Sequence, residues 1–234
     1  MKNAQRIGIG VFLICLLVVA GGYWHVKKTA SSKTANSTAA HPAQDHLTED
    51  QPGAVAPDET VPAKVELSPS QVEALSCYER GLTLYYDHKI AEALVLFNQA
   101  LDLDPQCYQA INGKGASYAF QGRYSEGIEL IEKAIQMKPD FVYARFNLGL
   151  AYELAGRWDE SIKAYHEALK IDDEDVWSYY GIASIYGRQG NVNKVIEYLK
   201  PAIALESEVK AVAREEKDFD PVKHDLRFIE LITK

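Results

Sequence analysis

The chain has 234 residues, of which 25 are Lys or Arg and 33 are Asp or Glu, giving a formal net charge of −8. All of this excess negative charge falls in residues 69–234, because the residues before them carry acidic and basic side chains in equal number. A net-negative surface is poorly suited to the phosphate contacts that dominate nucleic-acid binding, so nucleic acid is excluded as the expected partner.

An apolar run lies near the start of the chain. Residues 7–24 include no charged side chain, and as a helix they would span roughly 27 Å, close to the hydrocarbon core of a bilayer. Residues 1–24 are therefore predicted to be a transmembrane signal anchor. A secretory signal peptide cleaved after Val18-Val19-Ala20 is the alternative. Tyr23 and Trp24 favour the anchor, because their side chains suit a membrane interface.

The sequence gives less direct information on which side of the membrane the folded domain lies. Basic residues flank the apolar run on both sides, so the positive-inside rule does not decide between the two orientations. A very short tail ahead of the first hydrophobic segment usually stays in the cytoplasm. We therefore expect a single-pass protein whose folded domain is extracytoplasmic. A cytoplasmic-facing domain and a domain secreted after cleavage are the alternatives.

Residues 25–68 form a linker rich in Ala, Ser, Thr and Pro, with almost no aromatic residues. Such a composition cannot bury enough apolar surface to offset chain entropy, so we expect a disordered tether. Its ends would lie on the order of 35–40 Å apart. His41 and His46 are possible metal ligands, but two histidines on a flexible chain make a weak site, and no metal is expected.

A period of 34 residues runs through the chain from about residue 74 to residue 209. The positions that keep this spacing hold small or aromatic residues, and they are Gly81, Gly115, Gly149 and Ala183; Ala100, Ala134, Ala168 and Ala202; Tyr118, Tyr152 and Tyr186; and Gly122, Gly156 and Gly190. A fixed period of this length indicates a stacked array of small units rather than one globular fold with a single pocket.

Each unit is predicted to be two helices joined by a turn. In the third unit, a helix over about 142–154 and another over about 158–171 flank Ala155-Gly156-Arg157. This pattern resembles the tetratricopeptide repeat family, in which small residues allow close helix contacts. The resemblance implies an all-α solenoid within 69–234, with about four units at 74–107, 108–141, 142–175 and 176–209 and a capping helix within 210–234.

The end of the array is expected to differ from the rest. Pro201 lies inside the last repeat helix, where proline costs on the order of 3 kcal/mol unless the helix kinks. The fourth unit is therefore interpreted as a degenerate terminal repeat. Helices are predicted over about 209–217 and 222–232, and the second is expected to cover the apolar face that the last repeat exposes. A partner-docking helix is the alternative.

No catalytic motif stands out, so no enzymatic activity and no cofactor are expected. Gly113-Lys114-Gly115 lacks the spacing of a phosphate loop. Asp172-Asp173-Glu174-Asp175 lacks the alternating ligands and central glycine of a calcium loop, and its plainer role is to end one helix and cap the next at Asp175. Cys77 and Cys107 are expected to be buried free thiols; a disulfide is the alternative outside the cytoplasm.

The resemblance also implies a partner-binding groove lined by the first helix of each unit. The family's groove positions, carried onto this chain, fall on Leu75, Tyr78, Leu82, Tyr85, Tyr86, Gln109, Asn112, Ala116, Ala119, Phe120, Tyr143, Phe146, Leu150, Glu153, Leu154, Trp177, Tyr180, Ser184 and Arg188. Many of these are aromatic or apolar, and aromatic residues and Arg often carry interface energy. Half of them are equally compatible with packing inside the array, above all Phe120 and Leu154.

One sub-type of the family is disfavoured. Chaperone-binding arrays hold a terminal carboxylate with Lys, Asn and Arg, but Tyr78, Leu82 and Gly113 occupy the first such positions here. We therefore expect a protein or peptide ligand held through apolar anchors. Alanine at Tyr78, Phe146 and Tyr180 is expected to abolish binding without unfolding the domain.

Together these features predict a non-catalytic, membrane-tethered scaffold that contacts the membrane through residues 7–24 and binds a protein partner in its groove. Its expected setting is the assembly of an envelope complex. Two alternatives are a self-associating structural module that forms homo-oligomers and an accessory subunit of a membrane enzyme complex.

Overall fold

The computed structural model describes residues 67–233. The predicted anchor at 1–24 and nearly all of the predicted linker at 25–68 lie outside the described residues. Within residues 67–233, no helix has both the length and the apolar character needed to cross a membrane.

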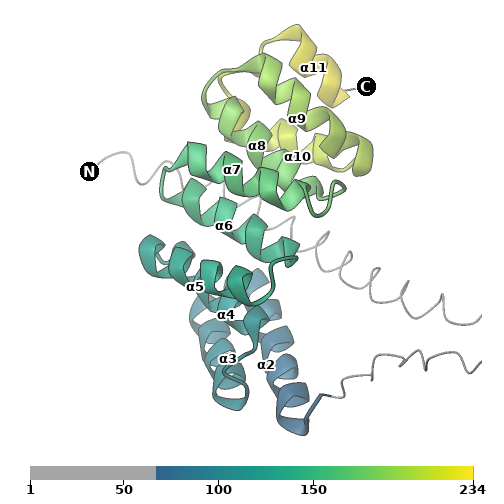
Figure 1. The fold of residues 1–234 in the computed structure, drawn as a ribbon. Coiled ribbons are helices and arrows are strands. Elements are labelled where there is room, and N and C mark those ends of the chain that lie inside the picture. The colour runs from purple at the N-terminus through teal and green to yellow at the C-terminus, as the bar shows by residue number, and fades with distance from the viewer. Residues whose placement is uncertain (1–66, 234) are drawn as a thin grey trace, which may run out of the picture.

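Four helical hairpins follow one another along the chain. They are α2 (Pro69–Tyr86) with α3 (Ile90–Leu103), α4 (Tyr108–Phe120) with α5 (Tyr124–Met137), α6 (Val142–Leu154) with α7 (Trp158–Leu169), and α8 (Val176–Arg188) with α9 (Val192–Leu205). We call the first helix of each pair its A helix and the second its B helix. Figure 1 shows the pairs stacked in chain order into an elongated array, which confirms the predicted all-α solenoid.

The turn between the A and B helices uses left-handed backbone. Gly122, Gly156 and Gly190 have φ angles of 80°, 73° and 71°, a conformation that glycine adopts without a steric cost. Unit one has His88 at the equivalent position, with a φ of 59°. The recurrence of glycine at this point of the period therefore has a backbone cause, and His88 is the exception to it.

A bulky side chain from each B helix fills the space left by small residues on the A helices. Phe97, Ile131 and Tyr165 lie against A-helix glycines, and all three are at most 1% exposed, as is Leu199 at the equivalent position of unit four. A methyl group added to Gly149 or Gly181 would lie 2.6 Å from the Tyr165 ring. The Tyr165 ring therefore wedges between α6 and α8, and only glycine at both positions leaves room for it.

The array curves with its A helices on the inner side. In units one to four, neighbouring A helices contact one another more closely than neighbouring B helices do. A stack that is tighter on one side bends toward that side, so the A helices line its concave face. This is the side to which the resemblance assigned the partner-binding positions.

The residues after α9 form a shortened fifth unit. They fold into α10 (Val209–Glu215), a 3-10 turn η1 (Lys217–Phe219) and α11 (Leu226–Thr233). The B helices begin at the 34-residue period, and their first residues are Ile90, Tyr124, Trp158, Val192 and Leu226. α10 with η1 thus takes the place of a fifth A helix, with η1 against α8, and α11 that of a fifth B helix against α9.

Two expectations about this end of the chain are corrected. The fourth unit is neither degenerate nor terminal, because α8 and α9 have 13 and 14 residues, as α4 and α5 do, and α9 accommodates Pro201. The final helix begins at Leu226 rather than near residue 222, since turns occupy most of the preceding segment. It packs against α9 and buries Phe228 and Ile232, as expected of a capping helix, while Leu226 at its start stays 80% exposed.

Candidate partner-binding site

The inner face consists of side chains at five positions of each A helix. In α2 these are Leu75, Tyr78, Leu82, Tyr85 and Tyr86, and the same positions recur at the 34-residue period in α4, α6 and α8. The structure divides this face into two parts with different chemistry. One is aromatic and extends over units one to three, and the other is ionic and joins units three, four and five.

We define the aromatic patch as Tyr78, Tyr85, Tyr86, Phe120, Tyr143 and Phe146. The Tyr85 and Phe120 rings meet edge to face with centroids 5.5 Å apart, and Tyr143 stacks on Phe146 with centroids 6.4 Å apart. The hydroxyls of Tyr86 and Tyr143 are 3.0 Å apart and form a hydrogen bond. Because α4 packs against both α2 and α6, this bond crosses the inner face of α4.

Only part of the aromatic patch is open to solvent. Tyr78, Phe120 and Tyr143 are partly exposed, whereas Tyr85, Tyr86 and Phe146 are buried. The remaining predicted residues of these units divide in the same way: Leu75, Leu82, Gln109 and Leu154 are partly exposed, and Asn112, Ala116, Ala119, Leu150 and Glu153 are buried. Burial raises the pKa of Tyr78 and Tyr143, and nearby tyrosines add to the effect, so both hydroxyls stay neutral.

A polar residue lies beneath the patch on α4. Asn112 occupies the position that Tyr78 has on α2 and Phe146 has on α6, and it is 0% exposed. Neither its Nδ2 nor its Oδ1 atom has a hydrogen-bond partner among residues 67–233. Buried amides are normally paired, so Asn112 is an unusual feature of an otherwise aromatic and apolar surface.

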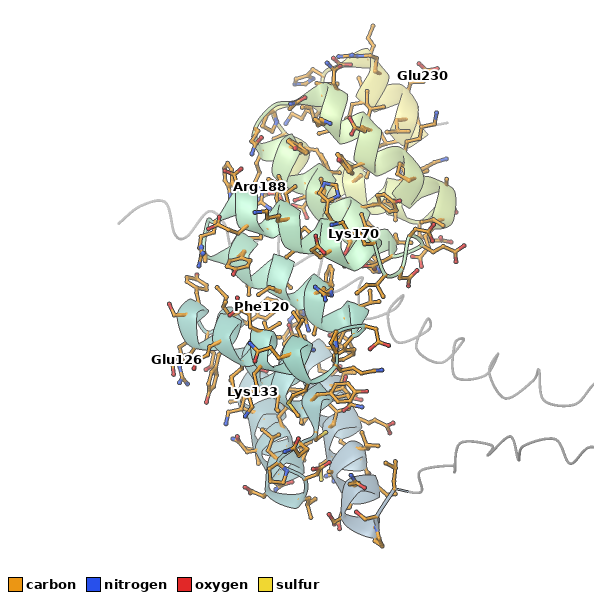
Figure 2. All side chains as sticks on the ribbon, in the orientation of Figure 1. Phe120, Glu126, Lys133, Lys170, Arg188 and Glu230 are labelled. Atoms are coloured by element: carbon orange, nitrogen blue, oxygen red, sulfur yellow. The ribbon has the colours of Figure 1, made fainter. Side chains whose placement is uncertain are left out.

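We define the ionic cluster as Glu153, Arg188, Glu216 and Asp218. The Arg188 guanidinium at the end of α8 pairs with Glu153 of α6 and lies 3.3 Å from Asp218 of η1. Tyr165 donates a 2.8 Å hydrogen bond to Glu153, and Ser184 donates a 2.5 Å hydrogen bond to Asp218. One cation therefore holds α6, α8 and η1 together. Figure 2 labels Arg188 on α8 and Phe120 at the equivalent position of α4.

Carboxylates outnumber cations in the ionic cluster. Glu216 is only 4% exposed, and its Oε2 atom has no partner in the described part of the chain. Burial, together with the nearby charge of Asp218, raises the pKa of Glu216 to about 7. Burial also raises the pKa of Glu153, against the opposing attraction of Arg188. The cluster therefore binds protons more readily than free carboxylates do.

The fifth unit covers the unit-four part of the inner face. Phe219 meets Tyr180 edge to face with centroids 5.8 Å apart, and Tyr180 is 0% exposed. Trp177 and Ser184 are buried as well. Among the predicted groove residues of α8, Arg188 is therefore the one that is partly exposed. Alanine at Tyr180 or Phe146 would open a cavity in the core. The expectation that these two substitutions spare the fold is therefore corrected.

Asp218, Phe219 and Glu216 were not among the predicted site residues. Glu216 was expected in the helix over about 209–217, and Asp218 and Phe219 in the break that follows it. A signal was nonetheless present, because Asp218 follows its hydrogen-bond partner Ser184 by one full period of 34 residues. Extending the period past residue 209 would have placed Asp218 on the inner face.

The other candidate side chains have structural roles. Cys77 and Cys107 are buried and are not bonded to each other. Asp175 is the N-cap residue of α8, as predicted, although its carboxylate accepts a hydrogen bond from the Ser178 hydroxyl rather than from the backbone. Between residues 67 and 233, no three metal-ligating side chains are grouped so as to hold an ion. His41 and His46 lie outside that range.

Two family models match the chain, and both are described as tetratricopeptide repeat. One matches residues 78–140 and 112–176, and the other matches residues 178–208. No curated protein matches the chain.

Several solved structures resemble the chain. MamA 41-end from Desulfovibrio magneticus RS-1 is 22% identical with a TM-score of 0.48, over 58% of this chain and 76% of its own. The Arabidopsis OM64 TPR domain is 15% identical with a TM-score of 0.46, over 50% and 97%. The first TPR of Spaghetti (RPAP3), bound to the HSP90 peptide SRMEEVD, is 17% identical with a TM-score of 0.45, over 50% and 92%.

Proposed function

The chain belongs to the tetratricopeptide repeat family, and we propose that it is a non-catalytic scaffold that holds one protein partner against its aromatic patch while tethered to a membrane. Repeat arrays of this kind present extended concave surfaces for binding. The partner would contact the A helices of units one to three.

The observation that carries this proposal is the partial exposure of Tyr78, Phe120 and Tyr143 on one concave face. Large rings supply contact area at a low cost in conformational entropy, which is why they anchor interfaces. The members of the aromatic patch carry no formal charge, so the favoured partner segment is apolar. The unit-four end is a poorer binding surface, because Phe219 and its neighbours already cover Tyr180.

A structural role for the ionic cluster supports the absence of catalysis. Glu153 and Glu216 are carboxyl groups whose pKa values are raised, yet they are 0% and 4% exposed. Glu153 is engaged by Tyr165 and Arg188. A carboxylate that is buried and paired as Glu153 is holds helices together rather than meets a substrate.

The proposed tether rests on the sequence of residues 1–68. The uncharged run at 7–24 would anchor the chain, and residues 25–68 would connect it to the array on the extracytoplasmic side. Confinement near the bilayer raises the effective concentration of a membrane-associated partner, so weak binding suffices. This arrangement suits the assembly of an envelope complex. Membrane fractionation with alkaline extraction and protease accessibility tests it: a protein released by alkali, or protected from external protease, contradicts it.

Crosslinking and capture from native membranes test the scaffold itself. The full chain is compared with a Tyr78→Ala/Tyr143→Ala variant, and Tyr124→Ala serves as the matched control because Tyr124 is 37% exposed on the B helix α5. We expect one partner to be captured by the wild type and the control but lost with the double variant. Equal capture by all three proteins, or no specific capture, contradicts the proposal.

A further inference from the structure

Two apolar side chains stay exposed where consecutive units join. Ile171 follows the end of α7 and is 40% exposed, and Leu205 ends α9 and is 41% exposed. They occupy the same position of the 34-residue period as Leu103 and Met137, which pack against core clusters in the first half of the array. Ile171 and Leu205 belong to no such cluster among residues 67–233. Single exposed hydrophobic residues are ordinary on a protein surface, so their significance depends on their surroundings.

Unpaired carboxylates surround both side chains. Residues 170–175 and 205–210 carry six carboxylates against two amines. One of these amines, on Lys170, already pairs with Glu167. Four of the carboxylates are partly or largely exposed and form no ion pair within residues 67–233, namely Asp173, Glu174, Glu206 and Glu208.

The opposite edge of the array has a different charge pattern. At or beside the turn between its A and B helices, each of the five units carries an ion pair, such as that of Arg157 with Glu160. The helix dipole favours acidic residues ahead of α8 and α10, but it gives no reason for apolar side chains to stay exposed among them. We define the junction patch as Ile171, Asp173, Glu174, Leu205, Glu206 and Glu208.

We propose that the junction patch docks a basic amphipathic segment of a partner protein. Apolar side chains of this segment cover Ile171 and Leu205, and its Lys or Arg side chains meet the unpaired carboxylates. Equivalent residues of neighbouring units lie roughly 10 Å apart, the spacing of packed helices, so the segment carries two apolar side chains at about that distance. The junction patch lies outside the aromatic patch, and this second surface does not rest on the proposed function.

Charge complementarity selects this occupant. A basic segment is attracted to a surface whose carboxylates lack cations, which raises its association rate and disfavours acidic competitors. Nucleic acid and anionic lipid headgroups carry the same sign of charge as the patch and are repelled by it. Since the carboxylates are exposed, salt screens the attraction, and the complex is expected to weaken as the salt concentration rises.

The test uses the full-length chain and peptides selected against it from a displayed random-sequence library. The patch variant is Asp173→Asn/Glu174→Gln/Glu208→Gln. Its charge-matched control is Glu92→Gln/Glu129→Gln/Asp159→Asn, because these three residues are exposed on α3, α5 and α7 and likewise form no ion pair in the described part of the chain. We expect one class of selected peptides, rich in Lys or Arg and in apolar residues, to bind the patch variant about tenfold more weakly. The control keeps the wild-type affinity.

A second comparison separates docking from diffuse attraction to an acidic protein. Ile171→Ser/Leu205→Ser is compared with Val72→Ser/Val95→Ser, whose two valines are each 55% exposed on α2 and α3. The same peptides should bind the first variant about tenfold more weakly and the second as tightly as the wild type. Equal affinities for these two variants contradict the docking of apolar side chains on the junction patch.

The remaining outcomes are equally decisive. The proposal is overturned if no basic class of peptides is selected, or if the patch variant and its charge-matched control bind that class equally. Peptides lost only with Tyr78→Ala/Tyr143→Ala leave the proposed function standing and remove the junction patch as a second surface. A wild-type dimer that the patch variant does not form would assign the patch to a second copy of the chain and overturn the proposal as well.

Discussion

Glu153 and Arg188 form an ion pair between α6 and α8, although 35 positions separate them in the chain. The Glu153 side chain is 0% exposed and that of Arg188 is 15% exposed, and Asp218 of the fifth unit shares the same guanidinium. The contact therefore couples three successive units of an array in which packing otherwise joins mainly neighbours.

Removing the cation of this pair should be strongly destabilising. Arg188→Met leaves Glu153 buried without its cation, with only the Tyr165 hydroxyl bonded to it, which we expect to lower the free energy of unfolding by about 3–5 kcal/mol. Urea denaturation measures the loss. Arg157→Met is the control, because the Arg157–Glu160 pair is exposed and is expected to contribute less than about 1 kcal/mol. Similar small losses for both variants contradict the account of the ionic cluster.

The fit between Tyr165 and the A-helix glycines should be sensitive to one methyl group. Gly149→Ala would place its Cβ atom 2.6 Å from the Tyr165 ring, so we expect a loss of about 1–3 kcal/mol in the free energy of unfolding. The equivalent B-helix residue of unit four is Leu199, so Tyr165→Leu is a compatible background. Gly149→Ala should cost less free energy of unfolding in the Tyr165→Leu protein than in the wild type. An equal cost in both proteins contradicts the close packing of Tyr165 against Gly149.

The left-handed turn of unit one offers a stabilising substitution. His88 has a φ of 59° where the other units have glycine, so His88→Gly should raise the free energy of unfolding by about 1 kcal/mol. Gly122→Ala is the converse control, because no atom lies within 4 Å of its added Cβ atom and only the backbone is strained. It should lose a similar amount. A thermal melt in which His88→Gly is the less stable protein shows that the His88 side chain outweighs its strain.

Glu216 should make stability fall as the pH rises. Its pKa is about 7 in the folded protein against an ordinary value of 4.5, so the folded state binds the extra proton between these values. The contribution is fully present below pH 4.5 and is lost as the pH rises through 7, amounting to up to about 3 kcal/mol. Asp218, Arg188 and Tyr180 are the charged or titratable groups around it.

Urea denaturation at pH 5.5 and pH 8 measures this dependence. Glu216→Gln should remove most of it, because the amide carries no charge at either pH. A wild-type protein that is more stable at pH 8, or a variant with an unchanged pH dependence, contradicts the role assigned to Glu216.

The sequence was sufficient to predict the array, because each repeated small residue has a packing cause. Gly81, Gly115 and Gly149 lie against Phe97, Ile131 and Tyr165, and Gly156 supplies a positive φ. These local requirements recur from unit to unit, with His88 as the exception at the turn, so they were visible as a period. The bounds of α6 agree with the prediction for the same reason.

The fifth unit was hidden because it lacks those residues. Lys217 stands where earlier units have Gly or Ala, and His224 stands where units two to four have a turn glycine. Its shortened helices do not need the same close approach. The solvent exposure of the inner-face side chains could not be predicted either. The burial of Tyr180, for example, depends on its contact with Phe219, which belongs to the fifth unit.

The most direct test of the central claim is the affinity of the array for its captured partner. Titration of the purified partner is compared for the wild type, Tyr78→Ala/Tyr143→Ala and the outer-face control Tyr124→Ala. The aromatic patch account predicts a loss of at least about tenfold for the double variant and an unchanged Kd for the control. Indistinguishable Kd values for all three folded proteins would show that the partner binds elsewhere.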